Sequence, residues 1–182
     1  MVKRNKKVKG FNTKSPGNTV KNNTNPLLVK VNRENIWFDL QSNSWLKSIK
    51  TKDFTNFFYD STDHSKTLFH LLYVLIPQVV KNWDSIISRR NGFNHCHLIT
   101  DEEKRNKAMK IYKKIHGHEL SEEVNIWSLG ITGGERLICI FNDLEKALIP
   151  IFVDHHHLIF PSQKHNHDDF ESSSFCAVCE YR

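Results

Sequence analysis

Acidic residues are missing from the first 33 positions of the chain. This segment contains no Asp or Glu and holds nine basic residues: Lys3, Arg4, Lys6, Lys7, Lys9, Lys14, Lys21, Lys30 and Arg33. The whole chain of 182 residues has a formal net charge of +6, so removing those nine charges leaves about −3 for residues 34–182. The basic character therefore belongs to the amino-terminal segment, and the rest of the chain is mildly acidic.

Long apolar runs and secretion signals are missing as well. No apolar stretch reaches the roughly 18 residues that a membrane-spanning helix requires, and the basic start of the chain is not followed by the apolar core of a signal peptide. We therefore expect a cytoplasmic protein without membrane association. In that compartment the four cysteines are expected to be thiols or metal ligands rather than disulfides.

Composition divides the chain into three parts. Residues 1–26 are polar, basic and rich in Asn, Ser, Thr and Gly, which predicts a disordered tail. Residues 27–161 carry apolar side chains at helical and strand spacing and predict one domain. Residues 162–182 predict a polar C-terminal tail that ends in a CxxC motif, and the chain contains no internal repeat.

Helical spacing dominates the first part of the predicted domain. Apolar residues recur from Leu68 to Val80 and again to Ile87, with Thr62 as the expected N-cap and Pro77 as the expected kink or restart. A second helix is expected from Thr100, its N-cap, to about His116. Its inward side chains are predicted to be Ala108, Ile111, Tyr112 and Ile115.

Three consecutive strands are predicted after these helices, at Ile126–Thr132, Arg136–Asn142 and Ile149–Phe160. Alternation places Trp127, Leu129 and Ile131 on one face of the first strand. The expected fold class is therefore α+β, with a helical N-terminal half packed on a small antiparallel β meander.

The third predicted strand ends in three consecutive histidines, which are candidates for acid–base chemistry. In an extended strand His155 and His157 share one face, and His156 lies on the other with Asp154. Burial and a nearby carboxylate move the pKa of a histidine in opposite directions, so a neutral and a charged imidazole can lie side by side near neutral pH. Metal binding and a structural role inside the sheet are the alternatives.

Arg136 is the second catalytic candidate because it follows a Gly-Gly turn at the start of the middle strand. A guanidinium at this position could clamp a phosphate with two hydrogen bonds and stabilise developing negative charge. The alternative is a salt bridge to Glu135 or Glu145.

Cysteine and histidine residues also suggest a zinc site. His95 and His97, together with Cys176 and Cys179, supply the ligand types of a Cys2His2 centre. A metal-dependent nuclease of the HNH type is a further alternative. It would use Asp154, His155 and His156 with Asn166 and His167 downstream.

Residues 95–160 resemble the RelE/ParE superfamily of toxin-type ribonuclease folds. The resemblance lies in the runs Ile126–Ile131, Glu135–Phe141 and Ile151–Leu158. It implies two helices on an antiparallel sheet and metal-free RNA cleavage without a cofactor. His155 or His157 would then act as base or acid, and Arg136 would stabilise charge on the phosphate.

The resemblance therefore implies an RNA-directed protein that acts on RNA or an RNA-associated complex, with metal-free endoribonuclease activity of the toxin type as the expected reaction. The residues expected to contact nucleic acid are Lys3, Arg4, Lys6, Lys7 and Arg105. The alternative is a non-enzymatic inhibitor of the phage or plasmid type. Its mildly acidic body and exposed aromatic side chains would bind a basic protein that handles nucleic acid.

Overall fold

A five-stranded mixed sheet forms the centre of the domain in the computed structural model, which describes residues 35–89, 92–131, 134–161 and 172–181. The strands are β1 (Trp37–Phe38), β2 (His97–Leu98), β3 (Asn125–Leu129), β4 (Arg136–Asn142) and β5 (Ala147–Asp154). Their order is β1-β5-β4-β3-β2; β1 runs parallel to β5 and all other neighbours are antiparallel. The α+β class and the meander of β3, β4 and β5 are thus confirmed.

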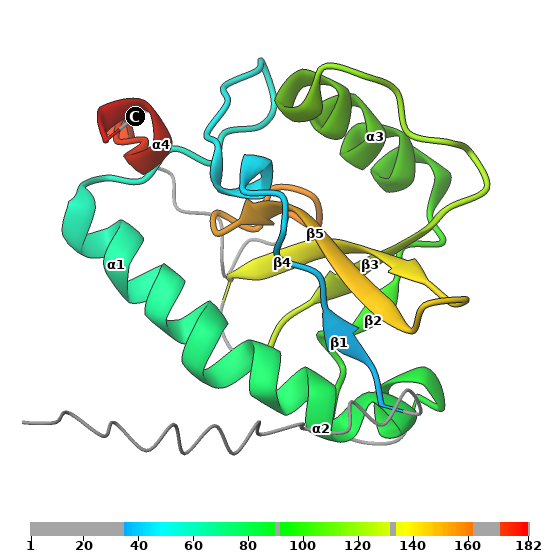
Figure 1. The fold of residues 1–182 in the computed structure, drawn as a ribbon. Helices are drawn as coiled ribbons and strands as arrows, with labels where there is room; N and C mark the ends of the chain where they lie inside the picture. Colours follow the sequence, from blue (N-terminus) through cyan, green and yellow to red (C-terminus); the bar gives the residue numbers. More distant parts are fainter. Residues whose placement is uncertain (1–34, 90–91, 132–133, 162–171, 182) are drawn as a thin grey trace, which may run out of the picture. The chain divides into compact units, whose positions relative to one another are not determined.

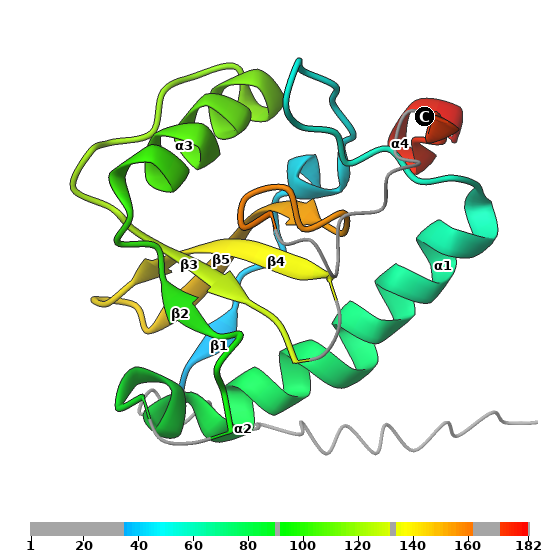
Figure 2. The ribbon, with the colours of Figure 1, turned by 180° about the vertical axis from the view of Figure 1, so that it is seen from behind.

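Helices cover both faces of this sheet (Figures 1 and 2). On one face, α1 (Ser61–His70), a π-helical turn η2 (Leu71–Leu75) and α2 (Ile76–Ile87) follow one another directly. On the other face lies α3 (Glu102–His116). A short 3-10 helix η1 (Ser44–Leu46) and a short helix α4 (Ala177–Glu180) complete the described elements.

Aspartates, not threonines, cap the two long helices. The carboxylate of Asp60 accepts the N–H of Asp63 at 2.8 Å, and that of Asp101 accepts the N–H of Lys104 at 3.0 Å. Each carboxylate also lies at the positive end of the helix dipole. The predicted caps Thr62 and Thr100 are therefore wrong by one or two positions.

Pro77 is accommodated by the π-helical turn that precedes it. A proline has no N–H to donate to the carbonyl four residues earlier, so the regular hydrogen-bond ladder cannot pass through it. In the preceding turn the N–H of Ile76 instead bonds to the carbonyl of Leu71, five residues back. The helix thus restarts as α2 with Pro77 in its first turn.

Apolar side chains pack in two layers, one on each side of the sheet. Between the sheet and α1–α2 lie Leu71, Leu75, Val79, Trp83 and Ile86, together with Leu129, Leu137, Cys139, Leu148 and Val153. Trp127 and Ile131 pack against the same layer, which confirms the predicted face. Between the sheet and α3 lie Ala108, Ile111, Tyr112 and Ile115, as predicted, with Phe54, Ile126, Ile138 and Phe152.

The last strand is shorter than predicted. β5 ends at Asp154, and His155 begins a turn in which His157 has a positive φ of 60°. The turn forms because the Asp154 carboxylate accepts the N–H groups of Leu158 and Ile159, each at 2.8 Å. The prediction of a strand through Phe160 is therefore wrong.

Part of the predicted C-terminal tail packs on the domain. Phe175 forms an isolated β-bridge with Phe58, with both backbone hydrogen bonds at 2.9 Å. Cys176 beside it is buried. The described residues 172–181 therefore belong to the same compact unit, which extends from Asn32. The predicted disordered tail, residues 1–26, lies outside the described residues.

Candidate functional site

Arg136 and Asp154 face each other at one end of the sheet, because they are cross-strand partners on β4 and β5. Both are buried, with exposed fractions of 2% and 0%. The Arg136 guanidinium donates to the backbone oxygen of Glu135 at 2.7 Å and lies 3.1 Å from Nδ1 of His95. Gly130 makes room for it, because a Cβ there would lie 2.7 Å from Nη1 of Arg136.

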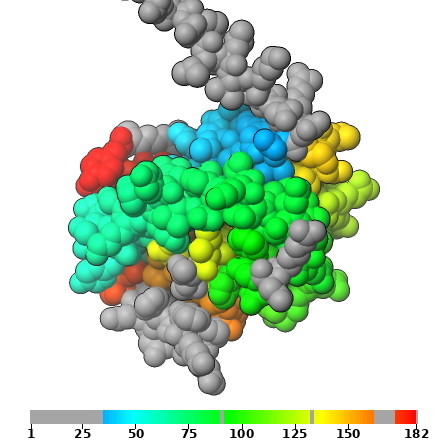
Figure 3. All heavy atoms as spheres, turned by 90° about the horizontal axis from the view of Figure 1, so that it is seen from below, coloured from blue at the N-terminus to red at the C-terminus, as the bar shows by residue number. Residues whose placement is uncertain are grey.

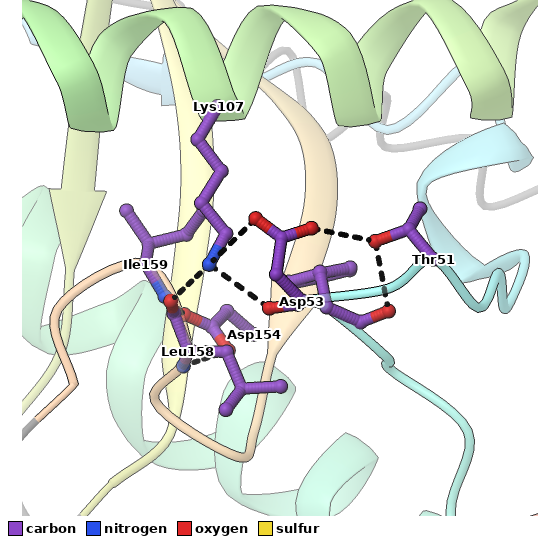
Figure 4. A network of polar contacts seen from close by, with 7 residues as sticks. Thr51, Asp53, Lys107, Asp154, Leu158 and Ile159 are labelled. Atoms are coloured by element: carbon purple, nitrogen blue, oxygen red, sulfur yellow. Dashed lines mark hydrogen bonds and ion pairs between the residues drawn. The ribbon is translucent and has the colours of Figure 1, made fainter.

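Asp154 organises the turn that carries the histidines (Figure 4). Burial raises the pKa of its carboxyl from 3.8 to about 6, although the two backbone hydrogen bonds and the charges of Lys107 and Arg136 act in the opposite direction. Lys107 reaches this turn from α3, because its ammonium donates to the backbone oxygen of Leu158 at 2.8 Å. The Asp154 carboxylate therefore holds the turn itself, and Lys107 ties this turn to α3.

All three histidines follow the end of β5 rather than lying on a strand, and His155 and His156 lie against the segment before α1. His155 stacks on Phe58 with ring centroids 4.1 Å apart and an interplanar angle of 6°, and Nε2 of His156 lies 3.0 Å from the backbone oxygen of Phe57. Their exposed fractions are 8% for His155, 6% for His156 and 8% for His157. The predicted common strand face of His155 and His157 is wrong, because the chain turns after Asp154.

The structure thus gathers several sequence-predicted residues, of which Arg136 is buried, His97 is partly buried and His95 is exposed. Arg136 touches His95, and the edge of His97 meets the ring of Phe160 with centroids 4.8 Å apart. Burial lowers the pKa of His97, and the positive charge of Arg136 acts in the same direction. Arg136 therefore presents little surface to a polymer, whereas His95 beside it is exposed.

The proposed zinc ligands do not form one set. His95 and His97 lie at β2, whereas Cys176 precedes α4 and Cys179 lies within it. The part of the chain that the structure describes contains no group of three or more His, Cys, Asp or Glu side chains that could hold a metal ion. Zinc binding remains a prediction, and Asn166 and His167 of the HNH hypothesis lie outside the described residues.

The predicted nucleic-acid contacts are only partly placed. Lys3, Arg4, Lys6 and Lys7 lie outside the described residues. Arg105, on α3, donates to the backbone oxygens of Glu122 and Val124 and so fixes the connection into β3. No helix of the described residues is long and apolar enough to cross a membrane.

A basic groove that sequence reasoning missed lies between α3 and the segment Thr51–Asp53. Its volume is about 520 Å³. It is lined by Thr51, Lys52, Asp53, Glu103, Asn106, Lys107, Lys110, Ile111 and Lys114. Four ammonium groups thus face two carboxylates in a domain whose net charge is negative.

One of the four lysines is tethered and the other three are not. Lys107 donates to the backbone oxygen of Asp53 at 2.9 Å and lies 3.6 Å from its carboxylate, as Figure 4 shows. Lys52, Lys110 and Lys114 form no ion pair with a carboxylate among the described residues. Lys107 therefore shapes the groove, and the other three ammonium groups remain available for an anion.

The sequence contained one signal for this groove. Lys107, Lys110 and Lys114 are spaced by three and four residues, which places them on one face of a helix. The contribution of Lys52 depends on a tertiary contact across more than fifty residues, which no local pattern indicates.

Comparison with known proteins gives one family. Residues 41–182 match the family described as "Uncharacterised protein UU032". A relative with that description from Ureaplasma parvum serovar 3 (strain ATCC 700970) is 32% identical over 174 residues, which cover 93% of each chain. No solved structure matches.

The resemblance to the RelE/ParE superfamily is overturned by this result, because the matched family is a different one. The resemblance depended on alternating apolar residues around a single arginine. Many antiparallel hairpins share that pattern, because alternation follows from burying one face of any strand.

Proposed function

The chain belongs to the UU032 family, and from the geometry of its domain we propose that it binds single-stranded RNA through the groove between α3 and Thr51–Asp53. The observation that carries this proposal is the set of three lysines, Lys52, Lys110 and Lys114, that line one groove without a carboxylate partner among the described residues. Each ammonium that meets a phosphate releases a condensed counterion and so favours binding.

Charge distribution supports this proposal. Residues 34–182 have a net charge of about −3, so an even distribution would not concentrate lysines in one place. The repulsion among Lys52, Lys107, Lys110 and Lys114 costs free energy in the unbound protein, and a bound polyanion would relieve it.

The shape of the groove favours a single strand. A volume of about 520 Å³ accommodates a nucleotide or two of flexible backbone, whereas a rigid duplex cannot enter a groove between a helix and a loop. Single-stranded RNA can present consecutive phosphates to such a groove. The groove offers Ile111 but no aromatic side chain for stacking, so we expect weak sequence preference.

The proposal does not extend to cleavage. Arg136, His155 and His157 are buried at one end of the sheet, and a general base must reach the proton that it removes. Incubation of a labelled RNA with the protein, followed by a denaturing gel, tests this point. Shortening of the RNA by the wild-type chain but not by His157→Ala would restore the ribonuclease hypothesis.

Fluorescence anisotropy with a labelled 12-nucleotide RNA tests the binding proposal. We expect Lys110→Glu/Lys114→Glu in the full chain to weaken binding at least about tenfold at low salt, because two phosphate contacts are replaced by repulsion. Lys146→Glu/Lys50→Glu makes the same change of net charge outside the groove lining and serves as the control. Equal loss in both double variants would contradict the groove.

The basic amino-terminal segment requires its own variant. Lys3→Gln/Arg4→Gln/Lys6→Gln/Lys7→Gln removes four positive charges from that segment and leaves the groove intact. If this variant lost all RNA binding while Lys110→Glu/Lys114→Glu bound normally, the RNA site would lie in the amino-terminal segment and the proposal would fail.

A further inference from the structure

Two cysteines lie at the two ends of the first turn of α4. Cys176 is the N-cap residue and has an extended backbone, with φ −131° and ψ 108°, and Cys179 is the third residue of the helix. The backbone N–H of Cys179 donates to the backbone oxygen of Cys176 at 3.0 Å, which closes the turn between them. The side chains at an N-cap and at the third helical position point toward each other, so the two sulfurs meet over this turn.

This spacing is compatible with a disulfide. A disulfide requires Cα atoms about 4.4–6.8 Å apart, and one turn of α-helix places Cα atoms three residues apart at about 5 Å. Both cysteines are thiols in the structure. Cys176 and Cys179 can therefore be joined without a change in the course of the chain.

The two thiols differ in access to solvent. Cys176 is only 4% exposed, whereas Cys179 is exposed. Figure 3 shows α4, coloured red, at the surface of the molecule beside α1. A pair with one accessible and one covered sulfur suits thiol–disulfide exchange. The accessible sulfur attacks an external disulfide, and the covered sulfur then attacks the mixed disulfide that results.

The surroundings of the covered sulfur favour its thiolate, which is the attacking species. Burial acts to raise the pKa of the Cys176 thiol, but hydrogen bonds from the side chain of Cys179 and from Ser48 lower it below its ordinary value. Ser48 is itself buried and is fixed by a hydrogen bond from its hydroxyl to the backbone oxygen of Asn56 at 3.2 Å. Cys176 is thus prepared for the second of the two attacks.

The other two cysteines have the opposite properties. Cys96 and Cys139 are both buried in the apolar layer between the sheet and α1–α2. Burial raises the pKa of both thiols. We expect both to be inert in the folded chain, so that they serve as internal controls.

We propose that Cys176 and Cys179 form a dithiol site that exchanges with disulfides, separate from the groove proposed for RNA. The Cys179 thiolate attacks one sulfur of a disulfide RS–SR, a mixed disulfide forms on Cys179, and one RS⁻ leaves and is protonated. The Cys176 thiolate then attacks the Cys179 sulfur, the Cys176–Cys179 disulfide forms, and the second RS⁻ leaves and is protonated. The protein loses two electrons and two protons, and RS–SR gains them as two RSH molecules.

Oxidised glutathione is the probe that tests this site in the full chain. The protein is incubated with it in the presence of a chelator, quenched with acid and alkylated, and mass spectrometry counts the remaining thiols. We expect two of the four thiols to be lost together and to return in excess reduced glutathione, with Cys96→Ser/Cys139→Ser forming the same disulfide. In urea, all four thiols should react. Four thiols retained in the folded chain, or a disulfide that peptide mapping places at Cys96 or Cys139, would overturn the proposal.

Single variants test the order of the two attacks. Cys176→Ser should stop after the first step, so that one glutathione stays on Cys179 and the intramolecular disulfide is lost completely. Cys179→Ser changes an exposed side chain, and it should take up glutathione at least about tenfold more slowly because Cys176 is covered. Far-UV circular dichroism checks the fold of both variants. Equal rates of glutathione uptake by the two folded variants would contradict the assignment of Cys179 as the attacking sulfur and refute the site.

Discussion

The helices on the two sides of the sheet bury similar apolar stripes but present opposite surfaces to solvent. On α3 the groove-facing positions are Glu103, Lys107, Lys110 and Lys114. On α1–α2 the exposed positions include Phe69, Tyr73 and Val80. A charged exterior suits a helix that meets water or a polyanion, whereas an apolar exterior suits one that meets protein. The two sides therefore suit different surroundings.

Polar ties also anchor the helices on both sides of the sheet. On α1, Thr67 donates to one carboxylate oxygen of Glu135 at 3.0 Å, and Nδ1 of His70 lies 2.8 Å from the other oxygen. On α3, Lys107 bonds to the backbone oxygens of Asp53 and Leu158, and Arg105 bonds to those of Glu122 and Val124. The α3 ties therefore run to backbone oxygens, whereas the α1 ties run to a single carboxylate.

The largest expected loss of stability comes from the buried face of α1–α2, and the exposed face of the same helix provides the comparison. Leu75 is fully buried, and Leu75→Ala should lower the free energy of unfolding by about 3 kcal/mol through lost burial and a residual cavity. Leu72 is 45% exposed, and Leu72→Ala should cost less than about 0.5 kcal/mol in the monomer. Urea unfolding at low protein concentration measures both. Similar losses would show that the outer face contributes to the fold as much as the inner face.

A slightly smaller effect is expected from the polar tie at the end of β5. Asp154→Ala removes the acceptor for the buried N–H groups of Leu158 and Ile159, and unmet donors should cost about 2–3 kcal/mol in total after the relief of a buried charge. Asp143→Ala removes an exposed carboxylate that pairs with Lys146 and should cost less than about 0.5 kcal/mol. Thermal unfolding compares the two variants. If Asp154→Ala were as mild as Asp143→Ala, the turn would not depend on this carboxylate.

The elements that depend on local pattern were predictable from sequence. Ala108, Ile111, Tyr112 and Ile115 follow the helical period, and β3 follows strand alternation, so their buried faces were predicted correctly. β4 was predicted as a strand with the bounds that the structure shows. The two-residue strands β1 and β2 were not predictable, because their pairing with β5 and β3 defines them as strands. The end of β5 was missed because it is fixed by a side-chain hydrogen bond and not by a change in residue pattern.

The candidate sites were also predictable only as far as local pattern reaches. Sequence patterns selected Arg136, His95 and the three histidines, and the structure brings Arg136 and His95 into contact. The patterns could not show that Arg136 and the three histidines after β5 are buried while His95 is exposed. The burial of His155 and His156 depends on contacts with Phe58 and Phe57, about 100 residues away. The groove was missed for the same reason, because Lys52 and α3 meet only in the folded chain.

Lowering the pH should change the free energy of unfolding through the buried Asp154 carboxyl at the end of β5. The pKa of Asp154 is about 6 in the folded chain against an ordinary 3.8, since burial disfavours the charged form. Between these values the folded state binds more protons than the unfolded state, so this group adds stability as the pH falls and loses it as the pH rises through about 6. Relative to Asp154→Asn, which cannot titrate, the wild type should gain roughly 2 kcal/mol between pH 7 and pH 4.

Urea unfolding of both proteins at each pH gives this difference. Partly buried histidines such as His97 and His116, whose pKa values are lowered by partial burial, act in the opposite direction, and their effects cancel because both proteins contain them. A constant difference between wild type and variant across this pH range would mean that the Asp154 carboxyl titrates normally in the folded chain.

The smallest expected effect is a change in how RNA affinity depends on salt concentration when one lysine of the groove is neutralised. If Lys110 and Lys114 each contact a phosphate, neutralising one should weaken RNA binding by only a few fold, but it should also lower the slope of log affinity against log salt by about 0.7. Lys110→Gln and Lys114→Gln should therefore each show a salt slope that is smaller by about 0.7 than that of the wild type. Lys146→Gln on the β4–β5 hairpin should keep the wild-type slope. Affinity alone cannot make this distinction, because any change of net charge shifts it at low salt. A slope unchanged in both groove variants would show that the ammonium groups act at a distance and that α3 does not hold the strand.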